Sequence, residues 1–479
     1  MSTFSSRTIL ALSVGLVLAA GSASATNGYF THGIGTKSKS MAGAGSADPQ
    51  ELLEMATNPA GLALLPETID AGLGIFSPRR EYKTSPSQLN GNCFTPPGGT
   101  QPFCPFTIGP NNITSENEYF FIPYVAMNWK LDEQSVLGAA FYARGGMNTE
   151  WQGGTASFDP DGAAGPAPAM TFKGTYGGGF TGGEGVAGVD LMQAFLNLTY
   201  AWKTADDQFA LGASAIMAIQ SFQGRGVAAF SPYTKTYIES YMTTGQPKMP
   251  THLSGNGHDM SYGYGGSVGA LWNATKWLSV AAAYTSKMSM SKFSDYSDLY
   301  AEGGKFDIPS SATYGLTLRP NDAFTFDFDY QSIWYSDTPS VSNPIENLFT
   351  CPTVGGTNVE GCLGGKQGAG FGWRDMSVYK FGGSWKYSDQ WTFRAGYSFP
   401  DSQPIPKTQM EFNILAPGVV EEHYTVGFTR TMAGGDELSL SFMYAPDYSL
   451  KGQNNFDPTQ TVEFSMNQFE LEMSYSWKR

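Results

Sequence analysis

The stretch AFTFDFDYQ, residues 323–331, places a large aromatic side chain at every second position, with Thr, Asp, Asp and Gln between them. A β-strand points successive side chains to opposite faces, so one face of this strand is aromatic and the other is polar and acidic. The pattern fits a soluble sandwich with the aromatic face in its core. It also fits a membrane barrel with that face toward lipid and the acids toward a wet lumen.

The same alternation recurs along the chain and predicts about fourteen strands. They lie near residues 67–82, 118–131, 134–147, 190–203, 208–222, 259–273, 276–289, 310–320, 322–336, 374–387, 390–400, 420–431, 436–449 and 463–477. Short turns and long loops alternate between them, and tryptophans such as Trp129, Trp202 and Trp272 stand at strand ends. An even strand number, unequal connections and aromatic girdles are typical of bacterial outer-membrane barrels.

A large secreted β-protein would explain the alternation but not the unequal loops or the placement of the tryptophans. We therefore expect an all-β fold, a transmembrane antiparallel β-barrel of about 14 strands. The aromatic face of residues 323–331 should then face lipid, while Asp327 and Asp329 face the lumen.

Composition excludes several other classes of protein. Charged residues make up 15% of the 479 residues, against roughly 25% in a typical soluble domain. The mean hydropathy of −0.24 argues against a helical membrane protein. A net charge of −14 argues against a nucleic-acid partner, because phosphates would repel the chain.

The N-terminus predicts export. Residues 1–25 form a candidate signal peptide, with an apolar run at Thr8–Gly21 and a small-residue cleavage site at Ala23-Ser24-Ala25. The alternative is a buried N-terminal helix. The mature chain should begin near Thr26, and no later apolar run reaches the roughly 18 residues of a transmembrane helix.

Four cysteines lie in the exported part, and four cysteines allow three pairings. Cys93 and Cys104 lie close together in one Gly/Pro-rich stretch, and Cys351 and Cys362 do so in another. We expect these two local disulfides in an oxidising compartment. The sequence has no C-x-x-C and no histidine near the cysteines, so we expect no metal site, and we expect no cofactor.

Residues 26–66 precede the first strand and do not alternate. A segment of this length with no strand of its own fits inside a barrel of this width, as a plug. The expected organisation is a signal peptide at 1–25, an N-terminal plug or hatch at 26–66 and a barrel at 67–479.

Three short motifs resemble one known family. SMAGAGSA at 40–47 and TNPAGLA at 57–63 are similar to the N-terminal hatch of the FadL/TodX family of outer-membrane transporters of hydrophobic compounds. GMNTEW at 146–151 is similar to the segment where the third strand of that family kinks. The chain departs from the usual barrel ending, because Trp477 is followed by two basic residues.

The resemblance implies a role for each motif. The hatch motif would be Asn58, Pro59, Ala60 and Gly61. Gly145 and Gly146 would form a lateral gate, since glycine in a strand can host a bulge that opens the wall. The alternative is that the glycine pair simply ends a strand at a loop.

The family takes up long-chain fatty acids in some members and aromatic hydrocarbons in others. The implied route runs from external loops to a lumenal site near Tyr29 and Phe30, then sideways through the third-strand kink. The implied partners are hydrophobic small molecules, outer-membrane lipid and lipopolysaccharide, and the barrel-assembly machinery. We expect a monomer in the outer membrane of a Gram-negative bacterium.

Two long loops carry aromatic residues at helical spacing, which could line an apolar capture groove. They are Phe230, Tyr233, Tyr237 and Tyr241 in one loop and Phe293, Tyr296 and Tyr300 in the next. Packing of the loops against each other explains these residues equally well.

A fatty-acid carboxylate would need a cation in the lumen. Lys380 and Arg394 point inward by strand parity, and Arg144 lies beside the predicted kink. The alternative for these cations is a structural ion pair with Asp327 or Asp329.

Two other classes of function compete with transport of hydrophobic compounds. A barrel lipase is suggested by G-x-S-x-G at residues 265–269, although this motif lies inside a strand rather than at a strand-to-helix turn. A general porin would pass small polar solutes and would lack the segment 26–66. We expect no enzyme activity.

Overall fold

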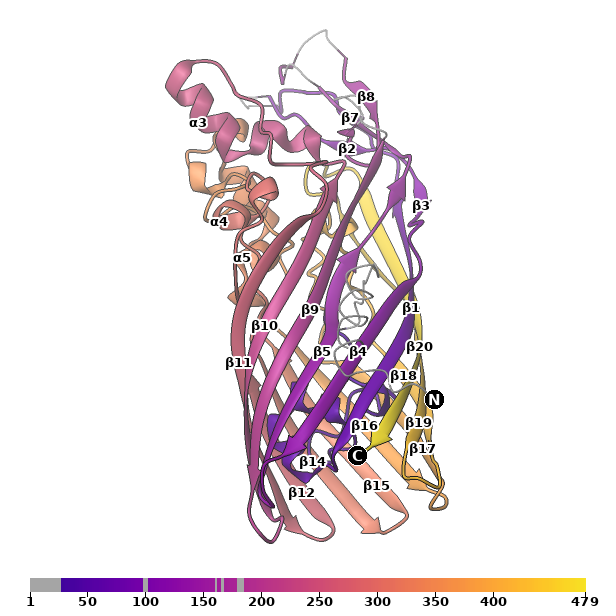
Figure 1. Cartoon of the computed structure of the whole chain (residues 1–479). Helices are drawn as coiled ribbons and strands as arrows, with labels where there is room; N and C mark the ends of the chain where they lie inside the picture. Colours follow the sequence, from indigo (N-terminus) through magenta and orange to yellow (C-terminus); the bar gives the residue numbers. More distant parts are fainter. Residues whose placement is uncertain (1–26, 98–101, 160–161, 165–167, 179–184) are drawn as a thin grey trace, which may run out of the picture.

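The computed structural model describes residues 27–97, 102–159, 162–164, 168–178 and 185–479, so the predicted signal peptide lies outside the described residues. In this part of the chain fourteen long strands form one closed antiparallel barrel, because β1 pairs with both β4 and β20 (Figure 1). The strands are β1 (Thr68–Thr84), β4 (Phe120–Lys130), β5 (Ser135–Asn148), β9 (Val186–Lys203), β10 (Phe209–Arg225), β11 (Asp259–Thr275), β12 (Leu278–Thr285), β14 (Ser311–Asn321), β15 (Phe324–Ile333), β16 (Met376–Lys386), β17 (Trp391–Pro400), β18 (His423–Thr431), β19 (Glu437–Gln453) and β20 (Thr461–Lys478). The predicted barrel is confirmed, and each strand lies within a few residues of its predicted position.

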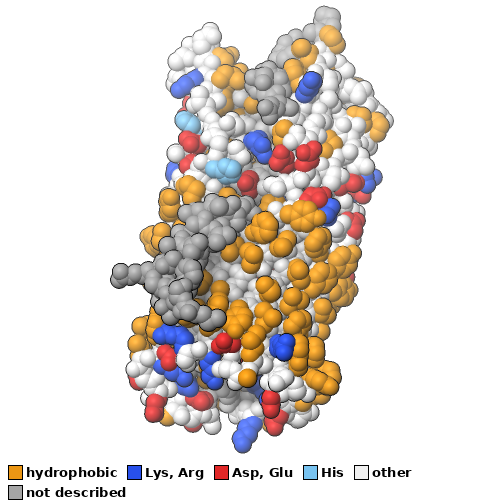
Figure 2. Space-filling model, turned by 45° about the vertical axis from the view of Figure 1, so that its right-hand side comes forward, with side chains coloured by type: hydrophobic (Ala, Val, Ile, Leu, Met, Phe, Trp, Pro, Cys, Tyr) orange, Lys and Arg blue, Asp and Glu red, His pale blue; other side chains and the backbone are white. Residues whose placement is uncertain are grey.

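The two faces of the wall have the predicted polarity. In β15 the side chain of Phe326 is 53% exposed on the outside, whereas Asp329 is fully buried inside. Hydrophobic side chains spread over the outer wall, with charged side chains gathered above and below them (Figure 2). This is the arrangement that a lipid-facing wall requires.

Short turns join the strands at one end of the barrel, and long loops join them at the other (Figure 1). The loops carry the short elements β2 (Thr107–Ile108), β3 (Asn112–Thr114), β6 (Trp151–Gln152), β7 (Thr155–Phe158), β8 (Met170–Lys173), η4 (Ala228–Tyr233), α3 (Lys235–Thr244), β13 (Ser289–Met290), η5 (Ser294–Tyr296), α4 (Ala301–Gly304), η6 (Tyr335–Asp337), α5 (Pro339–Ser342), η7 (Ile345–Thr350), η8 (Pro352–Val354), η9 (Val359–Gly361) and η10 (Phe412–Ile414). Both predicted disulfides, Cys93–Cys104 and Cys351–Cys362, lie in these loops. Across the described ranges, no helix combines the length and apolar character needed to cross a membrane.

Residues 27–66, which precede β1, are packed among the strands, and we call them the hatch. It contains α2 (Thr36–Lys39), η1 (Leu52–Ala56) and η2 (Pro59–Leu64), and most of its residues are buried. The helix α2 contacts β18, β19 and β20, whereas η2 contacts β9, β10 and β11. The hatch therefore spans the lumen from one wall to the other.

A buried ion-pair cluster attaches the hatch to β20. The ammonium of Lys39 lies 2.5 Å from a carboxylate oxygen of Glu470 and 2.5 Å from one of Glu472. Glu472 also accepts a hydrogen bond of 2.8 Å from the hydroxyl of Thr36. Burial alone would lower the pKa of Lys39, but the attraction of the two carboxylates outweighs burial and raises this pKa above its ordinary value. Lys39 is therefore a charged anchor of the hatch.

Removal of this anchor should loosen the hatch. In Lys39→Met, Glu470 and Glu472 stay buried without their cation, which costs about 3–5 kcal/mol for a broken buried pair. We expect a higher single-channel conductance in planar bilayers than for the native protein, while Lys39→Arg, which keeps the charge, should conduct like the native protein. An unchanged conductance of a folded Lys39→Met barrel would show that other contacts hold the hatch.

The C-terminus lies at the end of the barrel with the short turns. The backbone N–H of Arg479 donates to the carbonyl of Glu67, 3.0 Å away, just before β1 begins.

Short turns face the periplasm in bacterial outer-membrane barrels. An epitope tag placed after Arg479 should therefore stay unlabelled on intact cells and become labelled after permeabilisation. Labelling of intact cells would reverse this orientation.

Candidate functional site

The third strand of the barrel, β5, separates from its neighbour β4 before it ends. The pairing of β5 with β4 stops at Tyr142, whereas its pairing with β9 continues to Asn148. The register with β9 shifts between Ala143 and Gly145, which leaves Arg144 as an extra residue in a bulge. Residues 143–148 therefore have a wall neighbour on one side only.

The hatch supplies the missing partner from inside the barrel. The backbone N–H of Thr31 donates to the carbonyl of Arg144 at 3.2 Å, and the N–H of Gly146 donates to the carbonyl of Tyr29 at 3.2 Å. A Cβ atom on Gly145 would lie 2.6 Å from that carbonyl oxygen of Tyr29, so glycine is required for this approach. The glycine pair thus lies at a break in the wall.

An aromatic cluster surrounds this contact. Its members come from the hatch and from the loops after β13, β15 and α5: Tyr29, Phe30, Phe306, Tyr335 and Trp373. The ring centroids of Tyr29 lie between 5.2 and 6.1 Å from those of the other four. Tyr335 also accepts a hydrogen bond of 3.3 Å from the backbone N–H of Tyr29. Tyr29 and Phe30, which were predicted to line a lumenal site, therefore belong to a buried aromatic cluster.

Arg144 is the cation of this site. Its guanidinium lies 4.6 Å from the ring centroid of Phe30 and donates a hydrogen bond of 3.4 Å to Ser311. Within the described ranges no carboxylate lies at ion-pair distance from it. A small cavity reaches Arg144 and is also lined by Thr285 and Lys380. A buried guanidinium with free donors can take a carboxylate.

The other two predicted cations bind the hatch. Lys380 donates to the carbonyl of His32 at 2.9 Å, and Arg394 donates to the side-chain oxygen of Gln50 at 2.8 Å. Asp329, opposite Lys380 across the strands, accepts the backbone N–H of Ser46 at 3.0 Å. These inward charges thus hold the hatch rather than pairing directly with one another.

The hatch motif makes a tight turn against the wall. The side-chain oxygen of Asn58 caps η2 by accepting the N–H of Ala60 at 3.1 Å, and Pro59 occupies the first helical position. A Cβ on Gly212 of β10 would lie 2.3 Å from the carbonyl carbon of Pro59. One on Gly269 of β11 would lie 2.1 Å from the side-chain oxygen of Asn58. These two wall glycines were missed from sequence, because nothing in their own strands indicates what crosses them.

The end of the kinked strand is tied to a loop above it. Thr149 donates to the carbonyl of Leu415 at 2.8 Å, and the indole of Trp151 donates to that of Ile414 at 3.0 Å. Beside this contact lies a small, mainly apolar cavity, whose lining includes Phe76 of β1 and Gly146 of β5. The cavity therefore adjoins the break in the wall.

The predicted capture residues have two different environments. The loop between β13 and β14 holds three buried aromatic residues, Phe293, Tyr296 and Tyr300. Their ring centroids lie 4.8–5.5 Å from that of Phe222 of β10. In the third long loop, which joins β10 to β11, Phe230 is buried, Tyr233 and Tyr237 are half-buried, and Tyr241 is 55% exposed.

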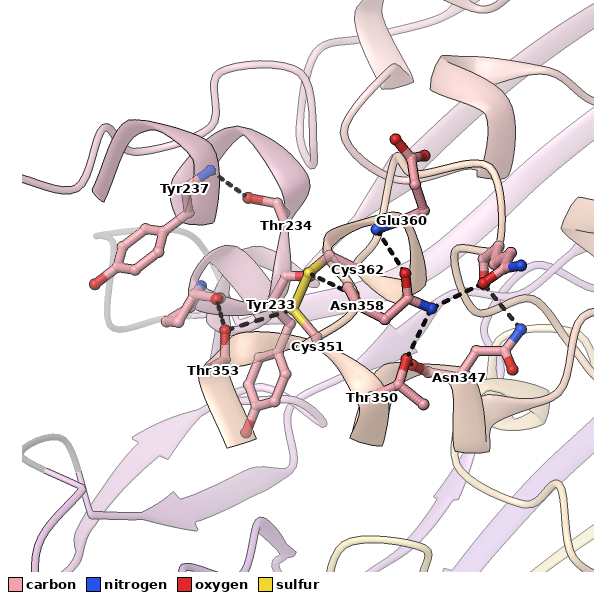
Figure 3. The surroundings of a disulfide bond; sticks show 12 residues. Tyr233, Thr234, Tyr237, Asn347, Thr350, Cys351, Thr353, Asn358, Glu360 and Cys362 are labelled. Carbon is pink, nitrogen blue, oxygen red and sulfur yellow. Dashed lines mark hydrogen bonds between the residues drawn. A yellow bond between two sulfur atoms is a disulfide. The ribbon is translucent and has the colours of Figure 1, made fainter. Parts of the chain in front are cut away.

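These two loops share an apolar cavity with two others. The cavity is lined by Phe230, Tyr300, Leu363, Phe371, Phe412 and Leu415, among other apolar residues. The disulfide Cys351–Cys362 lies beside it, packed with Ile238 and Tyr237 of α3 (Figure 3). The disulfide therefore closes a small loop that packs against α3, and Leu363 joins this loop to the segment before α3 by hydrogen bonds of 2.9 Å with Tyr233 and Lys235.

The cavities are small. The ones beside Arg144 and Gly146 each have a volume of about 20 Å³, and the one under the loops has about 40 Å³. Ligand sites for drug-sized molecules span roughly 300–1,000 Å³, and about 10–15 Å³ admits one water. A compound of that size would therefore fit these three cavities only if the hatch or the loops moved.

Known proteins share this architecture. Crystal structures of the Pseudomonas putida toluene transporter TodX and of a Pseudomonas aeruginosa FadL homologue match 94% of this chain and 99% of theirs, with a TM-score of 0.57 each. The sequence identities are 14% and 15%, so this likeness shows the fold alone.

Sequence comparisons give relatives that match half of the chain. The long-chain fatty acid transport protein of Salmonella typhi is 29% identical over 266 residues, which are 51% of this chain and 57% of the relative. The protein of that name from Escherichia coli (strain K12) is 27% identical over 274 residues, which are 51% and 58%. The chain thus spans just over half the length of the curated relatives it matches.

A family model has the widest match in sequence. The model described as outer membrane protein transport protein (OMPP1/FadL/TodX) matches residues 162–468, which is well over half of the chain. This chain belongs to the OMPP1/FadL/TodX family of outer-membrane transport proteins.

Proposed function

We propose that this protein is an outer-membrane channel for hydrophobic compounds, with long-chain fatty acids as its substrates. The observation that carries the proposal is the break in the wall beside β5, which the hatch closes from within. A barrel that only passed polar solutes along its axis would have no need of this break.

The cavities suggest a route. It starts under the external loops at Phe371, passes Trp373, and reaches the wall at Gly146, all of which line the apolar cavities described above. The ring centroids of Phe371 and Trp373 are 6.2 Å apart. Sideways exit favours apolar solutes, because burial in lipid contributes about 25 cal/mol per Å² of apolar surface.

Arg144 favours fatty acids over uncharged compounds. It is buried next to the aromatic cluster and, within the described ranges, lacks a carboxylate partner. A fatty acid would place its carboxylate at this guanidinium and its chain among the rings. The curated relatives are named long-chain fatty acid transport proteins, which supports this choice.

Aromatic hydrocarbons are the second candidate substrates. The cluster of Tyr29, Phe30, Tyr335 and Trp373 offers ring faces and edges to an aromatic ligand. One of the structures with the same fold is a toluene transporter.

The two rival classes have less support. Ser267 of the G-x-S-x-G motif lies inside β11, buried and paired across to β10 and β12, where no nucleophile turn forms. Gly269 of the same motif has a packing role, because the hatch turn crosses it. A general porin would leave the hatch without a purpose.

Filling the break should block release but not binding. In Gly146→Val the β-branched side chain favours a regular strand and occupies the space beside Phe76. We expect oleate uptake by cells to fall at least tenfold while oleate binding to the purified protein is kept. Gly434→Val is the matched control, since a Cβ there meets open space in a short turn. Normal uptake by a folded Gly146→Val barrel would favour passage through the hatch instead.

Neutralising Arg144 should separate the two candidate substrates. In Arg144→Met a charge-assisted hydrogen bond of roughly 1.5–3 kcal/mol is lost, so oleate should bind about ten to one hundred times more weakly. Toluene binding should stay the same, and so should both ligands in Arg430→Met, whose side chain is exposed on the barrel exterior. Unchanged oleate binding in Arg144→Met would leave aromatic hydrocarbons as the better candidates.

A further inference from the structure

Four lysines line an open cavity on the external loops, although the protein as a whole carries a net charge of −14. The cavity has a volume of about 480 Å³ and is lined by Lys235, Lys292, Lys305 and Lys366 together with Glu302 and Glu360. A volume of this size falls within the range of small-molecule sites.

Two of these lysines face each other directly. Lys292 and Lys305 are partners in an isolated antiparallel β-bridge. Like charges placed opposite each other across a strand pair are destabilising. An anion bound between the two ammonium groups would offset this repulsion.

The acidic residues nearby do not neutralise all four lysines. Lys235 pairs with Glu360 at 2.6 Å, and Lys305 pairs with Asp307 at 3.2 Å and with Glu302 at 4.0 Å. These carboxylates neutralise the charges of Lys235 and Lys305.

The other two lysines keep their charge available. Among the described residues, no carboxylate lies within ion-pair distance of the ammonium groups of Lys292 or Lys366. Lys366 contacts Glu360 only through its backbone N–H, at 2.8 Å. Two exposed cations therefore remain unpaired in this cavity.

The lysine cavity adjoins the apolar cavity under the loops. Gly303 and Gly364 line the first, and their near neighbours Tyr300 and Leu363 line the second. The hydroxyl of Ser340, which also lines the apolar cavity, donates to the carbonyl of Lys305 at 2.6 Å. The loop segments at residues 300–305 and 363–366 thus separate the lysine cavity from the apolar cavity.

The two segments are held in place. The N–H of Glu302 donates to the carbonyl of Gly365 at 2.9 Å, and the N–H of Lys235 donates to that of Leu363 at 2.9 Å. The disulfide Cys351–Cys362 ends one residue before Leu363, and Figure 3 shows it beside Glu360 and α3. These hydrogen bonds and the disulfide therefore hold the backbone of the lysine-bearing segments in place.

We propose that this lysine cavity is the outer docking site for amphiphiles with an anionic head group. The lysines take the head group, and the apolar chain enters the adjoining cavity when the loops part. The inference rests on the proposed channel function and gives it a charge filter at the entrance. The alternative source of an anion at this surface is a phosphate of lipopolysaccharide.

The test uses the full-length protein in liposomes free of lipopolysaccharide, with laurate, dodecanol of equal chain length, and toluene as probes. The variant Lys292→Gln/Lys366→Gln removes the two unpaired lysines and leaves every ion pair intact. The control Lys248→Gln/Lys407→Gln makes the same change in charge at two exposed loop lysines outside the cavity.

We expect the cavity variant to take up laurate about fivefold to tenfold more slowly than the native protein at 50 mM salt, because it lacks electrostatic capture. The difference should shrink at 500 mM salt, where charges are screened within roughly 4 Å. Dodecanol and toluene uptake, and every rate of the control variant, should match those of the native protein.

The outcomes separate the inference from the function on which it rests. If the native protein takes up none of the three probes, the channel function itself fails. If it takes up laurate and the cavity variant does so equally fast, or if it takes up only toluene, the charge filter is overturned while the channel stands. Loss of copurifying lipopolysaccharide phosphate with unchanged laurate uptake would assign the lysines to lipopolysaccharide and overturn the inference.

Discussion

The pairing of the hatch with the bulged end of β5 is the contact on which the rest of the structure depends. A barrel wall in hydrocarbon must pair its backbone groups, and β4 leaves β5 without a partner beyond Tyr142. The hatch takes that place through the carbonyl of Tyr29 and the N–H of Thr31. Withdrawal of the hatch would leave two buried backbone groups unpaired, at about 1–3 kcal/mol each. The break in the wall and the position of the hatch are therefore coupled.

The charges inside the barrel follow from the same contact. Most inward cations are used to hold the hatch: Lys39 is bound to β20, while Lys380 and Arg394 reach inward from the wall. Their partners are carbonyls, amides and carboxylates of the hatch or the opposite wall. Arg144 differs because it lies at the bulge, where the pairing partner of its carbonyl is the hatch backbone and its side chain turns to Phe30 and Ser311. One backbone irregularity thus produces both the break and the available cation.

Sequence alone predicted the wall well and its contents poorly. Alternation of side chains is local information, so the fourteen strands, the inward position of Asp329 and the local disulfides followed from it. The partners of Lys380 and Arg394 could not be predicted, because their contacts join residues more than 300 positions apart in the chain. The same limit explains Gly212 and Gly269, which have meaning only once the Asn58-Pro59 turn is known to cross them. The resemblance of GMNTEW to a family motif predicted a kink in this region, and the structure shows a bulge at Arg144 and an early end of the pairing with β4. Within this motif, Thr149 and Trp151 donate hydrogen bonds to the carbonyls of Leu415 and Ile414, which attaches the end of β5 to that loop.

The two ends of the proposed route would sort compounds by different properties. The loops present unpaired lysines over an apolar cavity, so charge on the head group matters there. The proposed exit lies beside the cavity between β1 and β5, where transfer into lipid would favour apolar surface. Arg144 lies two residues before Gly146 but lines a different cavity, and a carboxylate bound there would have to be released, or neutralised by a proton, before the chain could leave sideways, because an ionised carboxylate is strongly disfavoured in hydrocarbon. Because Thr31 and Tyr29 bond to Arg144 and Gly146, a movement of the hatch at Tyr29–Thr31 would change the surroundings of Arg144 and unpair the end of β5 in one step, so in the proposed mechanism release of the head group and opening of the exit need not be separate events.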